Sequence, residues 1–381
     1  MILPIKGPIA KFLDERTAHA TLDKIISEFE DQSKNPPGKD PVIAACYLAA
    51  IELIKQDPRF KNFLLQIIKK RTDLTAVHFI NLFFRSLQYI KLFRQKGNYL
   101  KIDWKKDLKN FLSNQKLKNE LMQVMINKDT STTKYQRYIS LYALINWFFP
   151  KRAVAIADFG CGGNYGLKGL ELEEKFETVI DETPGKFFLR LLRNSINLKF
   201  GLGIDKEDPD NETTHNWRIA CSFYPQELNK INSVLEFEKR IQAAKKVDFL
   251  RNNLVSEKIN TQHKFDIVII STVLYQISSS KNRQIIINKA KKILKGDGVL
   301  IIQDFANLDK TGNFDFSQSW FNKPFTYNTF IASSLTNWRF LWIFSWENGR
   351  SLKVKSGQDL KLLFDGYLPN SSSAAFAHSA S

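Results

Sequence analysis

The residues best suited to chemistry follow an apolar run near the middle of the chain. A strand is predicted at Ala153–Asp158, and it leads directly into the glycine-rich turn Phe159–Gly166, which reads FGCGGNYG. Glycine permits positive φ angles and lets a backbone pass close to a bound ligand. The turn therefore predicts contact with a nucleotide-like ligand, although a single glycine motif also fits an ordinary structural turn.

Four later segments strengthen the case, because they follow the turn in a defined order. Gly201–Asp205 is an apolar strand that ends in an acid, and Val247–Leu254 contains a strand followed by polar residues. Phe265–Tyr275 supplies a fourth strand and a loop, and Ala290–Asp304 supplies a helix, a turn and a fifth strand. As an ordered set, these segments resemble the class I S-adenosylmethionine-dependent methyltransferases, from about Tyr135 to Ala306.

The resemblance implies S-adenosylmethionine as the cofactor and assigns it a binding site. In that family the glycine turn approaches the amino-acid portion of the cofactor. The acid after the second strand binds the ribose hydroxyls, a polar residue after the third meets the adenine amine, and the fourth strand ends beside the transferred methyl group. The residues this implies for cofactor binding are Asp158, Gly160, Cys161, Gly162, Asn164, Asp205, Asn253 and Ser271.

Arg137 precedes the first strand, within the segment Tyr135-Gln136-Arg137-Tyr138. A guanidinium binds carboxylates well, so Arg137 is a candidate partner for the carboxylate of the cofactor. A surface ion pair is an equally good interpretation.

A dinucleotide-dependent oxidoreductase is the nearest alternative. That family has G-x-G-x-x-G at the turn and an acid about 20 residues later. Asp181 has this spacing, whereas Asp205 lies further along the chain. We favour Asp205 as the ribose ligand, because Thr183–Asn197 has the pattern of the helix that should precede the second strand. Under that interpretation Lys168–Glu182 is an insertion.

The sequence departs from the methyltransferase pattern at three places. Asn164 stands where a third glycine is common, which could change the path of the turn. Asn253 replaces the usual acid at the adenine position, which a neutral amide can also serve. The segment Lys206–Lys246 is much longer than the single short helix that the family often has there.

No general base is evident in the sequence. Methyl transfer from a sulfonium is an in-line displacement, so alignment of the acceptor supplies much of the rate, and a base is needed only when the acceptor must lose a proton early. The five histidines are scattered along the chain. Tyr275 and Asp304 stand at strand ends, where open α/β sheets bind ligands, so they are the candidate catalytic residues for contact with the acceptor. Packing is an equally good explanation for both.

The elements that would position these residues form an α/β, Rossmann-like fold. Short apolar runs alternate with amphipathic stretches after Pro150, a pattern typical of a mainly parallel sheet. We expect helices at Tyr135–Phe149 and Asn282–Leu294, and a C-terminal antiparallel hairpin of Trp338–Trp346 and Ser351–Val354, turning at Asn348-Gly349. The five predicted parallel strands are Ala153–Asp158, Phe200–Asp205, Val247–Leu250, Phe265–Ser271 and Gly298–Asp304.

An α-helical region precedes this fold. Apolar residues recur at helical spacing from Ile9 to about Lys128, interrupted by proline and glycine. We therefore divide the chain into a helical N-terminal region at 1–128, a methyltransferase domain with insertions at 129–369, and a disordered serine- and alanine-rich tail at 370–381.

The charge of the chain suggests an anionic partner without requiring one. Its 56 Lys and Arg exceed its 39 Asp and Glu, for a formal charge of +17. Such a balance favours RNA or an acidic membrane surface, and the densest basic run is Arg94–Lys118. A solvated helical face explains the same run. We expect a small-molecule acceptor, with RNA or protein methylation, or a non-catalytic Rossmann-like binding protein, as alternatives.

The three cysteines, Cys46, Cys161 and Cys221, match neither a disulfide framework nor a metal site. The chain is therefore expected to be reduced and cytoplasmic, with no metal. No apolar stretch reaches the length that a membrane span requires. The oligomeric state cannot be inferred from the sequence.

Overall fold

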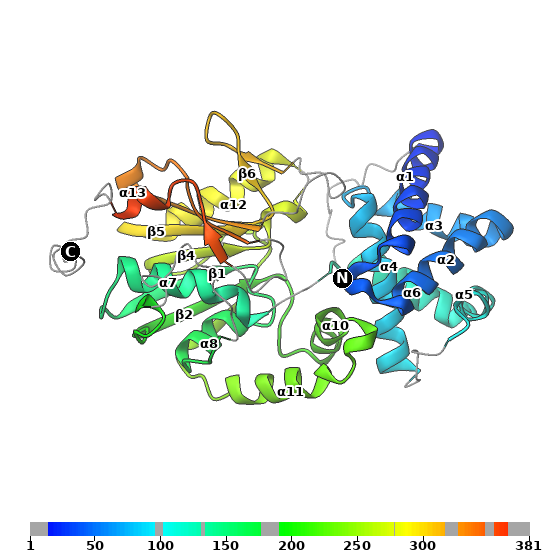
Figure 1. Cartoon of the computed structure of the whole chain (residues 1–381), viewed down its shortest axis with the longest axis horizontal. Helices are drawn as coiled ribbons and strands as arrows, with labels where there is room; N and C mark the ends of the chain where they lie inside the picture. The colour runs from blue at the N-terminus through cyan, green and yellow to red at the C-terminus, as the bar shows by residue number, and fades with distance from the viewer. Residues whose placement is uncertain are drawn as a thin grey trace, which may run out of the picture. The chain divides into compact units, whose positions relative to one another are not determined.

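A computed structural model describes residues 14–95, 102–130, 134–176, 190–277, 279–316, 327–346 and 354–364. The chain forms two compact units (Figure 1). The helical unit contains residues 1–132 together with 215–235, and the sheet unit contains 133–214 and 236–381. Residues 215–235, which the sequence analysis assigned to the methyltransferase domain, therefore cluster with the helical unit.

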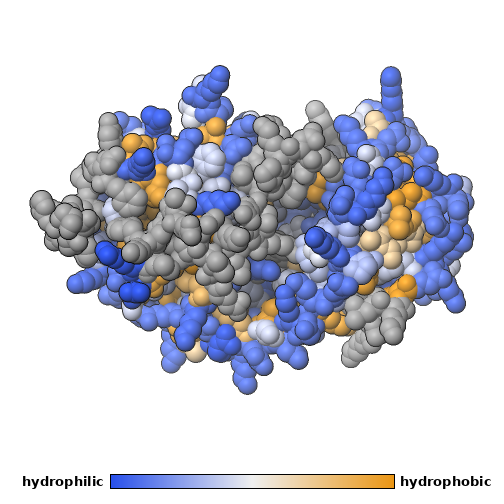
Figure 2. Space-filling model, viewed as in Figure 1, coloured by the Kyte–Doolittle hydropathy of each residue, from blue (hydrophilic) through white to orange (hydrophobic). Residues whose placement is uncertain are grey.

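The helical unit confirms the helical region expected before the sheet. Most of its helices start at a side chain that accepts a backbone N–H: Asp40 caps α2, Asp57 caps α3 and Asp103 caps α5. On the face shown in Figure 2, hydrophilic side chains cover most of this unit and apolar ones surface in smaller areas between them. The helices are α1 (Glu15–Lys34), α2 (Pro41–Gln56), α3 (Pro58–Lys70), α4 (Ala76–Tyr89), α5 (Trp104–Ser113) and α6 (Gln115–Asn127), with short helical turns η1 (Pro37–Lys39) and η2 (Ile90–Arg94).

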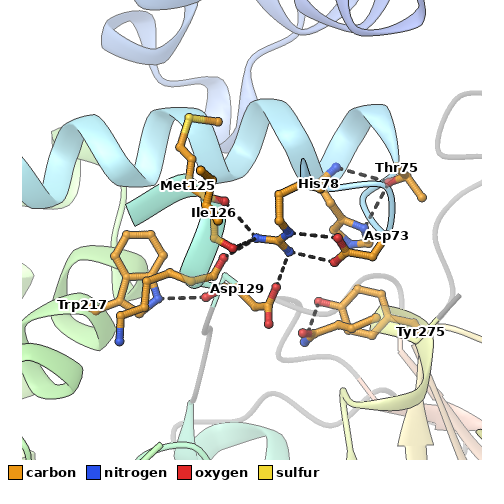
Figure 3. A network of polar contacts seen from close by, with 11 residues as sticks. Asp73, Thr75, His78, Met125, Ile126, Asp129, Trp217 and Tyr275 are labelled. Carbon is orange, nitrogen blue, oxygen red and sulfur yellow. Dashed lines mark hydrogen bonds and ion pairs between the residues drawn. The ribbon is translucent and has the colours of Figure 1, made fainter. Parts of the chain in front are cut away.

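A network of polar contacts that includes Met125, Asp129 and Trp217 connects the ends of several of these helices (Figure 3). Arg71 follows α3, and its guanidinium donates to the carbonyl of Met125 at 2.9 Å and to the carboxylate of Asp129 at 2.6 Å. The carbonyl of Asp129 in turn accepts the indole N–H of Trp217 at 2.8 Å. A residue from the 215–235 segment is thereby tied to the end of α6.

The same segment is held to α4 at a second point. It carries most of α10 (Glu212–Ser222), and the last carbonyls of that helix have no partner within the helix itself. Gln88 donates to the carbonyl of Ala220 at 2.5 Å, and the buried Arg85 donates to the carbonyls of Ala220 and Phe223. Cations and donors at a helix C-terminus are stabilising. Residues of the 215–235 segment are thus part of the core of the helical unit.

The sheet unit contains an eight-stranded sheet in the order β10-β9-β8-β5-β4-β1-β2-β3. Neighbours among β3, β2, β1, β4 and β5 pair in parallel, whereas β8, β9 and β10 extend the sheet antiparallel. The strands are β1 (Val154–Phe159), β2 (Leu198–Asp205), β3 (Val247–Arg251), β4 (Phe265–Ser271), β5 (Leu294–Asp304), β8 (Tyr327–Ser333), β9 (Leu341–Trp346) and β10 (Val354–Ser356), with a separate small hairpin of β6 (Asn307–Leu308) and β7 (Phe314–Asp315).

Helices cover both faces of the parallel part, as its nearly unbroken apolar strands require. Side chains alternate along β1, so Ile156 joins the core on one face and Ala157 the core on the other. The first face packs against α7 (Ile139–Phe148) and α8 (Tyr165–Glu171), and the second against α12 (Ser280–Ile293). The strand order reverses between β1 and β4, so ligands are expected at the carboxyl ends of these strands.

The remaining elements are η3 (Tyr135–Tyr138), η4 (Pro225–Glu227), α11 (Lys230–Ile241), η5 (Leu274–Gln276), η6 (Ser334–Thr336) and α13 (Leu360–Phe364).

The predicted Rossmann-like fold is confirmed, with differences at its C-terminal end. Strand β8 was not predicted, because Tyr327, Asn328 and Thr329 are all fully buried between β5 and β9 and show no alternation of apolar and polar residues. The first hairpin strand begins at Leu341 rather than Trp338, since Trp338 has a φ of 60°, which is incompatible with a strand. The turn at Asn348-Gly349 and the tail 370–381 lie outside the described residues.

Two other boundaries differ from the prediction. Strand β5 begins at Leu294 rather than at Gly298, so the turn expected between the helix Asn282–Leu294 and this strand belongs to the strand. Of the helix expected at Thr183–Asn197, the structure describes only 190–197, where residues 190–191 are helical and the rest is not. Among the described residues, no helix is long and apolar enough to cross a membrane.

A buried acid marks the amino edge of the sheet. Asp266, the second residue of β4, is fully buried. Its carboxylate accepts the backbone N–H of Ala155 at 2.8 Å and forms ion pairs with Arg152 and Lys295, each at 2.9 Å. This acid joins the start of β1 to the starts of β4 and β5.

Candidate functional site

The glycine turn after β1 lies across the end of β2. The N–H groups of Gly160 and Cys161 donate to the carbonyl of Ile204 at 2.7 and 3.3 Å. Gly160 and Gly162 have φ angles of 74° and 54°, which a glycine adopts without steric cost. The thiol of Cys161 is buried and donates to the carbonyl of Gly162 at 4.0 Å. The predicted turn is thus fixed against the neighbouring strand.

Asp205, the last residue of β2, binds the backbone of the glycine turn. Its carboxylate accepts the N–H of Gly162 at 2.9 Å and that of Glu207 at 3.4 Å. The side chain is only partly exposed, and burial raises its pKa while the backbone donors lower it. The acid predicted to hold the ribose therefore also holds the glycine turn. The alternative ribose ligand, Asp181, lies outside the described residues.

Asn164 explains one departure from the glycine pattern. It adopts a left-handed conformation, φ 56° and ψ 23°, immediately before α8. Its buried side chain lies where a side chain on Gly203 of β2 would be, since a Cβ there would be 2.5 Å from the amide oxygen of Asn164. The missing glycine of the turn is therefore compensated by a glycine on the next strand.

Gly160 is required for a reason that the sequence did not indicate. A Cβ at this position would lie 2.2 Å from Cγ2 of Val273, which follows β4. The space on that side is thus filled by a protein side chain rather than left open toward a ligand. Gly160 allows the glycine turn and the segment after β4 to pack directly together.

Asp158 is fully buried near the end of β1. One of its oxygens accepts the hydroxyl of Tyr138, and the other, Oδ1, has no hydrogen-bond partner among the described residues. Burial raises the pKa of Asp158 to about 7, a rise that the Tyr138 hydroxyl opposes and the charge of Asp205 assists. Such an acid is costly to bury unless a donor completes its contacts.

Tyr138 and Arg137 reach this edge from η3. Gly166 lets α8 approach this segment, since a Cβ there would lie 1.9 Å from the Tyr138 ring. The carbonyl of Arg137 accepts the amide N–H of Gln303 on β5 at 3.0 Å. The buried guanidinium of Arg137 lies 5.6 Å from the ring centre of Tyr327, a cation–π contact.

Ser271 ends β4, and its hydroxyl lies 3.1 Å from that of Tyr327. The next residue, Thr272, has a φ of 57°. A β-branched residue in this conformation costs about 1–3 kcal/mol and is typical of functional sites. Tyr275 follows and packs edge-on against Phe305, with ring centres 5.0 Å apart.

Burial raises the pKa of Tyr275 and of Tyr327 at this edge. The pKa of Tyr275 lies well above its ordinary range, because burial and the nearby Asp304 oppose its ionisation. The pKa of Tyr327 rises to about 12, mainly through burial, although Arg137 partly offsets the effect. Both phenols are therefore protonated near neutral pH, where they can donate hydrogen bonds but cannot act as bases.

Asp304 ends β5 and is fully buried. One oxygen accepts the N–H groups of Leu274 and Tyr275 at 2.8 and 3.4 Å, and the other accepts that of Phe305 at 2.7 Å. Burial raises its pKa to about 7 against the lowering effect of these donors. The carboxylate thus contacts the backbone of the segments after β4 and β5.

The end of β3 presents two asparagines in different surroundings. Asn253 is exposed, and its side-chain oxygen accepts the N–H groups of Val255 and Ser256 at 3.0 and 3.2 Å. Asn252 is buried, its backbone N–H donates to the carbonyl of Asp205 at 2.8 Å, and its Oδ1 has no hydrogen-bond partner among the described residues. The buried amide therefore lies beside the expected ribose ligand.

Similarity to known proteins is limited to parts of solved structures. The chain is similar to the N-methyltransferase NodS from Bradyrhizobium japonicum WM9 in complex with S-adenosyl-L-homocysteine, at 14% identity over 54% of this chain and 74% of that one, with a TM-score of 0.26. It is similar to an O-methyltransferase family protein from Burkholderia thailandensis, at 14% identity over 70% of this chain and 55% of that one, with a TM-score of 0.30.

A third similar structure is CalS10, an amino pentose methyltransferase from Micromonospora echinaspora solved with S-adenosylmethionine. The identity is 11% over 53% of this chain and 59% of that one, and the TM-score is 0.27. No protein-family model matches the sequence. No curated protein sequence matches it either. At these values the likeness concerns the fold at most, so function has to be inferred from the side chains of the site.

Three residues of this edge were missed by sequence reasoning: Tyr138, Asn252 and Tyr327. Tyr138 stands next to the predicted Arg137, and Asn252 stands next to the predicted Asn253. Tyr327 begins the unpredicted strand β8, and nothing in its neighbourhood marks it as part of a site. Among the described residues, no cluster of His, Cys, Asp and Glu could hold a metal ion.

Proposed function

We propose that the protein transfers methyl groups from S-adenosylmethionine. The observation that carries this proposal is the charge of the carboxyl edge of the sheet. Asp158, Asp205 and Asp304 surround the glycine turn and the segment after β4, and none of the three forms an ion pair within the described part of the chain. Carboxylates held in this way favour a ligand that carries positive charge.

S-adenosylmethionine fits these residues, because it carries both an ammonium group and a sulfonium. The free Oδ1 of Asp158 can accept from the ammonium group, Asp205 from the ribose hydroxyls, and the free Oδ1 of Asn252 from the adenine amine. When bound, the cofactor supplies a methyl group on a positively charged sulfur. The protein's own residues orient the two reactants and exclude water. We retain Gly160, Gly162 and Asn164 as the residues that shape the turn.

The same charges argue against a dinucleotide. A pyrophosphate needs exposed backbone N–H groups or cations, whereas here the N–H groups of Gly160, Cys161 and Gly162 are already bonded to Ile204 and Asp205. An anionic ligand would also be repelled by Asp158 and Asp205. We therefore keep Asp205 as the proposed ribose ligand.

We propose a small-molecule acceptor. The phenols of Tyr275 and Tyr327 have raised pKa values and cannot serve as bases. An acceptor that attacks without losing a proton first, such as a neutral amine, needs none. RNA is less favoured, because two cations of the basic run are paired: Arg94 with Glu120 and Lys105 with Glu52. Tyr275 and Ser271 are the side chains we place nearest the acceptor.

The test is a comparison of ligands on the intact protein. S-adenosylhomocysteine should raise the melting temperature and bind in calorimetry with an affinity in the micromolar range, of about 10⁻⁶ to 10⁻⁵ M. NADH should do neither. Stabilisation by NADH and none by S-adenosylhomocysteine would overturn the proposal. Binding to RNA that weakens steeply as salt rises would instead favour a nucleic-acid acceptor.

A further inference from the structure

We propose that Asp304 is a positioning residue, which caps η5 from a neighbouring strand and thereby holds the Thr272–Tyr275 segment against the glycine turn. Its contacts with the backbone are independent of any cofactor. Its effect on cofactor affinity rests on the proposed function above.

Helix η5 lacks a cap of its own. The residue before it, Val273, has an apolar side chain and makes no capping hydrogen bond. The first N–H groups of a helix need acceptors, which a nearby Asp, Asn, Ser or Thr normally supplies. Here Asp304 supplies one from the end of β5, at 2.8 Å from the nitrogen of Leu274 and 3.4 Å from that of Tyr275.

The capped segment is the one that contacts the glycine turn. Cγ2 of Val273 lies where a side chain on Gly160 would be, so a shift of η5 would open or close this contact. The segment is also strained, since Thr272 is left-handed. Strain of this kind persists only where surrounding contacts hold it. Besides Asp304, these contacts include the bond from the Thr272 N–H to the carbonyl of Gln303 at 2.8 Å.

The other oxygen of Asp304 holds the backbone that follows β5. It accepts the N–H of Phe305 at 2.7 Å, and the ring of Phe305 packs against both Tyr275 and Tyr327. One carboxylate thus sets the relative positions of the residues after β4 and β5. Because Asp304 is fully buried and bonded through both oxygens, it acts through the backbone rather than by touching an acceptor.

The cap should depend on pH. The ionised carboxylate accepts from three N–H groups, whereas a protonated one loses acceptor strength. Burial raises the pKa of Asp304 to about 7, so protonation near neutral pH weakens the cap. The charged and titratable groups that act on it are Arg283 of α12, Tyr275 of η5 and Tyr327 of β8. Both phenols stay protonated in this range, so Asp304 is the group that changes.

The first experiment measures hydrogen exchange of the ligand-free protein. In Asp304→Asn, protection of the Leu274 and Tyr275 amides should fall about tenfold, the size of effect that loss of a helix cap produces. In the unmodified protein, protection corrected for intrinsic exchange should fall between pH 8 and pH 6, and in Asp304→Asn it should not change with pH. Equal protection in both proteins, or no pH dependence in the unmodified one, would overturn the cap.

The matched control is Asp309→Asn. Asp309 also accepts backbone N–H groups, those of Thr311 and Asn313 at 2.8 and 2.9 Å, but it lies in an exposed turn between β6 and β7. Its substitution should leave the exchange of Leu274 and Tyr275 unchanged. A similar loss of protection in both variants would show that the effect is not specific to Asp304, and would overturn the assignment.

The second experiment measures S-adenosylhomocysteine affinity by calorimetry at pH 8. Asp304→Asn should bind about tenfold more weakly than the unmodified protein, while Asp309→Asn should bind equally well. Loss of protection with unchanged affinity would overturn the link between the cap and the cofactor site. If the unmodified protein does not bind this ligand, the proposed function fails, and the exchange experiment still decides the cap.

Discussion

At the amino edge of the parallel sheet, the buried Asp266 is surrounded by positive charge, whereas at the carboxyl edge Asp158 and Asp304 are equally buried and form no ion pair among the described residues. Arg152 and Lys295 both form ion pairs with the Asp266 carboxylate. Burial raises the pKa of Asp158 and Asp304 to about 7. The acid at the amino edge is electrostatically complete, whereas at the carboxyl edge the unbonded Oδ1 of Asp158 would be completed by a cation from outside the chain.

The two edges of the sheet therefore have different roles: the amino edge stabilises the fold, and the carboxyl edge is suited to binding a ligand. A buried ion pair stabilises the fold only if its partners satisfy it fully, as Arg152 and Lys295 do for Asp266. An acid left without a cation reduces stability and gains affinity for a positively charged ligand. Substitutions at the amino edge should therefore affect folding, and those at the carboxyl edge should affect binding.

The largest effect is expected at the amino edge. Asp266→Ala removes the acceptor of the Ala155 N–H and leaves Arg152 and Lys295 without their shared partner, so the free energy of unfolding should fall by about 3 kcal/mol. Denaturant titration measures this loss. Affinity for S-adenosylhomocysteine, measured where the variant is folded, should stay within about twofold. A folded variant that binds much more weakly would break the contrast between the edges.

The next effect concerns the carboxyl edge. Asp205→Ala should weaken S-adenosylhomocysteine binding about a hundredfold, because it removes a charged acceptor from the ribose and releases Gly162. Calorimetry of the two proteins measures the change. Its effect on unfolding should be smaller than that of Asp266→Ala, since the pKa of Asp205 is already raised by burial.

The control for that measurement is the pair of asparagines after β3. Asn253→Ala should leave affinity unchanged, because its side-chain oxygen is bonded to the following turn. Asn252→Ala should weaken binding, because its Oδ1 is buried and free to accept. The reverse result would restore Asn253 as the adenine contact expected from the sequence.

A third test concerns steric overlap, rather than charge, near the carboxyl edge. Gly203→Ala should lower the free energy of unfolding by about 2 kcal/mol, because the new Cβ would overlap the amide of Asn164. Adding Asn164→Gly removes that amide and should recover about half of the loss. Denaturant titrations of both single variants and the double variant give the coupling energy. Independent, additive effects would contradict the proposed compensation between these positions.

Sequence reasoning found this fold because the parallel strands have a strong pattern. β1 and β4 are apolar at nearly every position and are followed by glycine or polar residues, so their ends could be placed within a residue or two. The same reasoning missed β8, where buried Asn328 and Thr329 hide the strand pattern. Alternation of apolar and polar residues reveals a strand that is buried on one face. The method fails when polar residues are buried on both faces of the strand.

The sequence predicted which strand ends lie at one edge of the sheet, but not the side-chain contacts made there. Sequence spacing brought Asp158 and Asp205 together, because parallel strands end at one edge. It could not reveal that Tyr138 donates to Asp158, or that Val273 rather than a ligand fills the space beside Gly160. Those contacts depend on tertiary packing between segments far apart in the sequence. For the same reason, the sequence did not show that residues 215–235 cluster with the helical unit.

The smallest effect tests the raised pKa of Asp158. Its folded pKa of about 7 exceeds the ordinary 3.8, so the folded state holds a proton that the unfolded state releases between these values. Stability from this group is therefore present at low pH and is lost as pH rises from about 4 to about 7, with a slope of up to about 1.4 kcal/mol per pH unit.

The Tyr138 hydroxyl lowers that pKa, so Tyr138→Phe should extend the decline in stability to higher pH and cost about 1 kcal/mol near neutral pH. Denaturant titrations of both proteins from pH 5 to pH 8.5 give the two profiles. The ammonium group of S-adenosylmethionine should stabilise the ionised carboxylate, so its binding near pH 7 should release protons, measurable by calorimetry in buffers of different ionisation enthalpy. Proton uptake on binding would mean that Asp158 does not face a cation, and the two edges of the sheet would no longer differ as we propose.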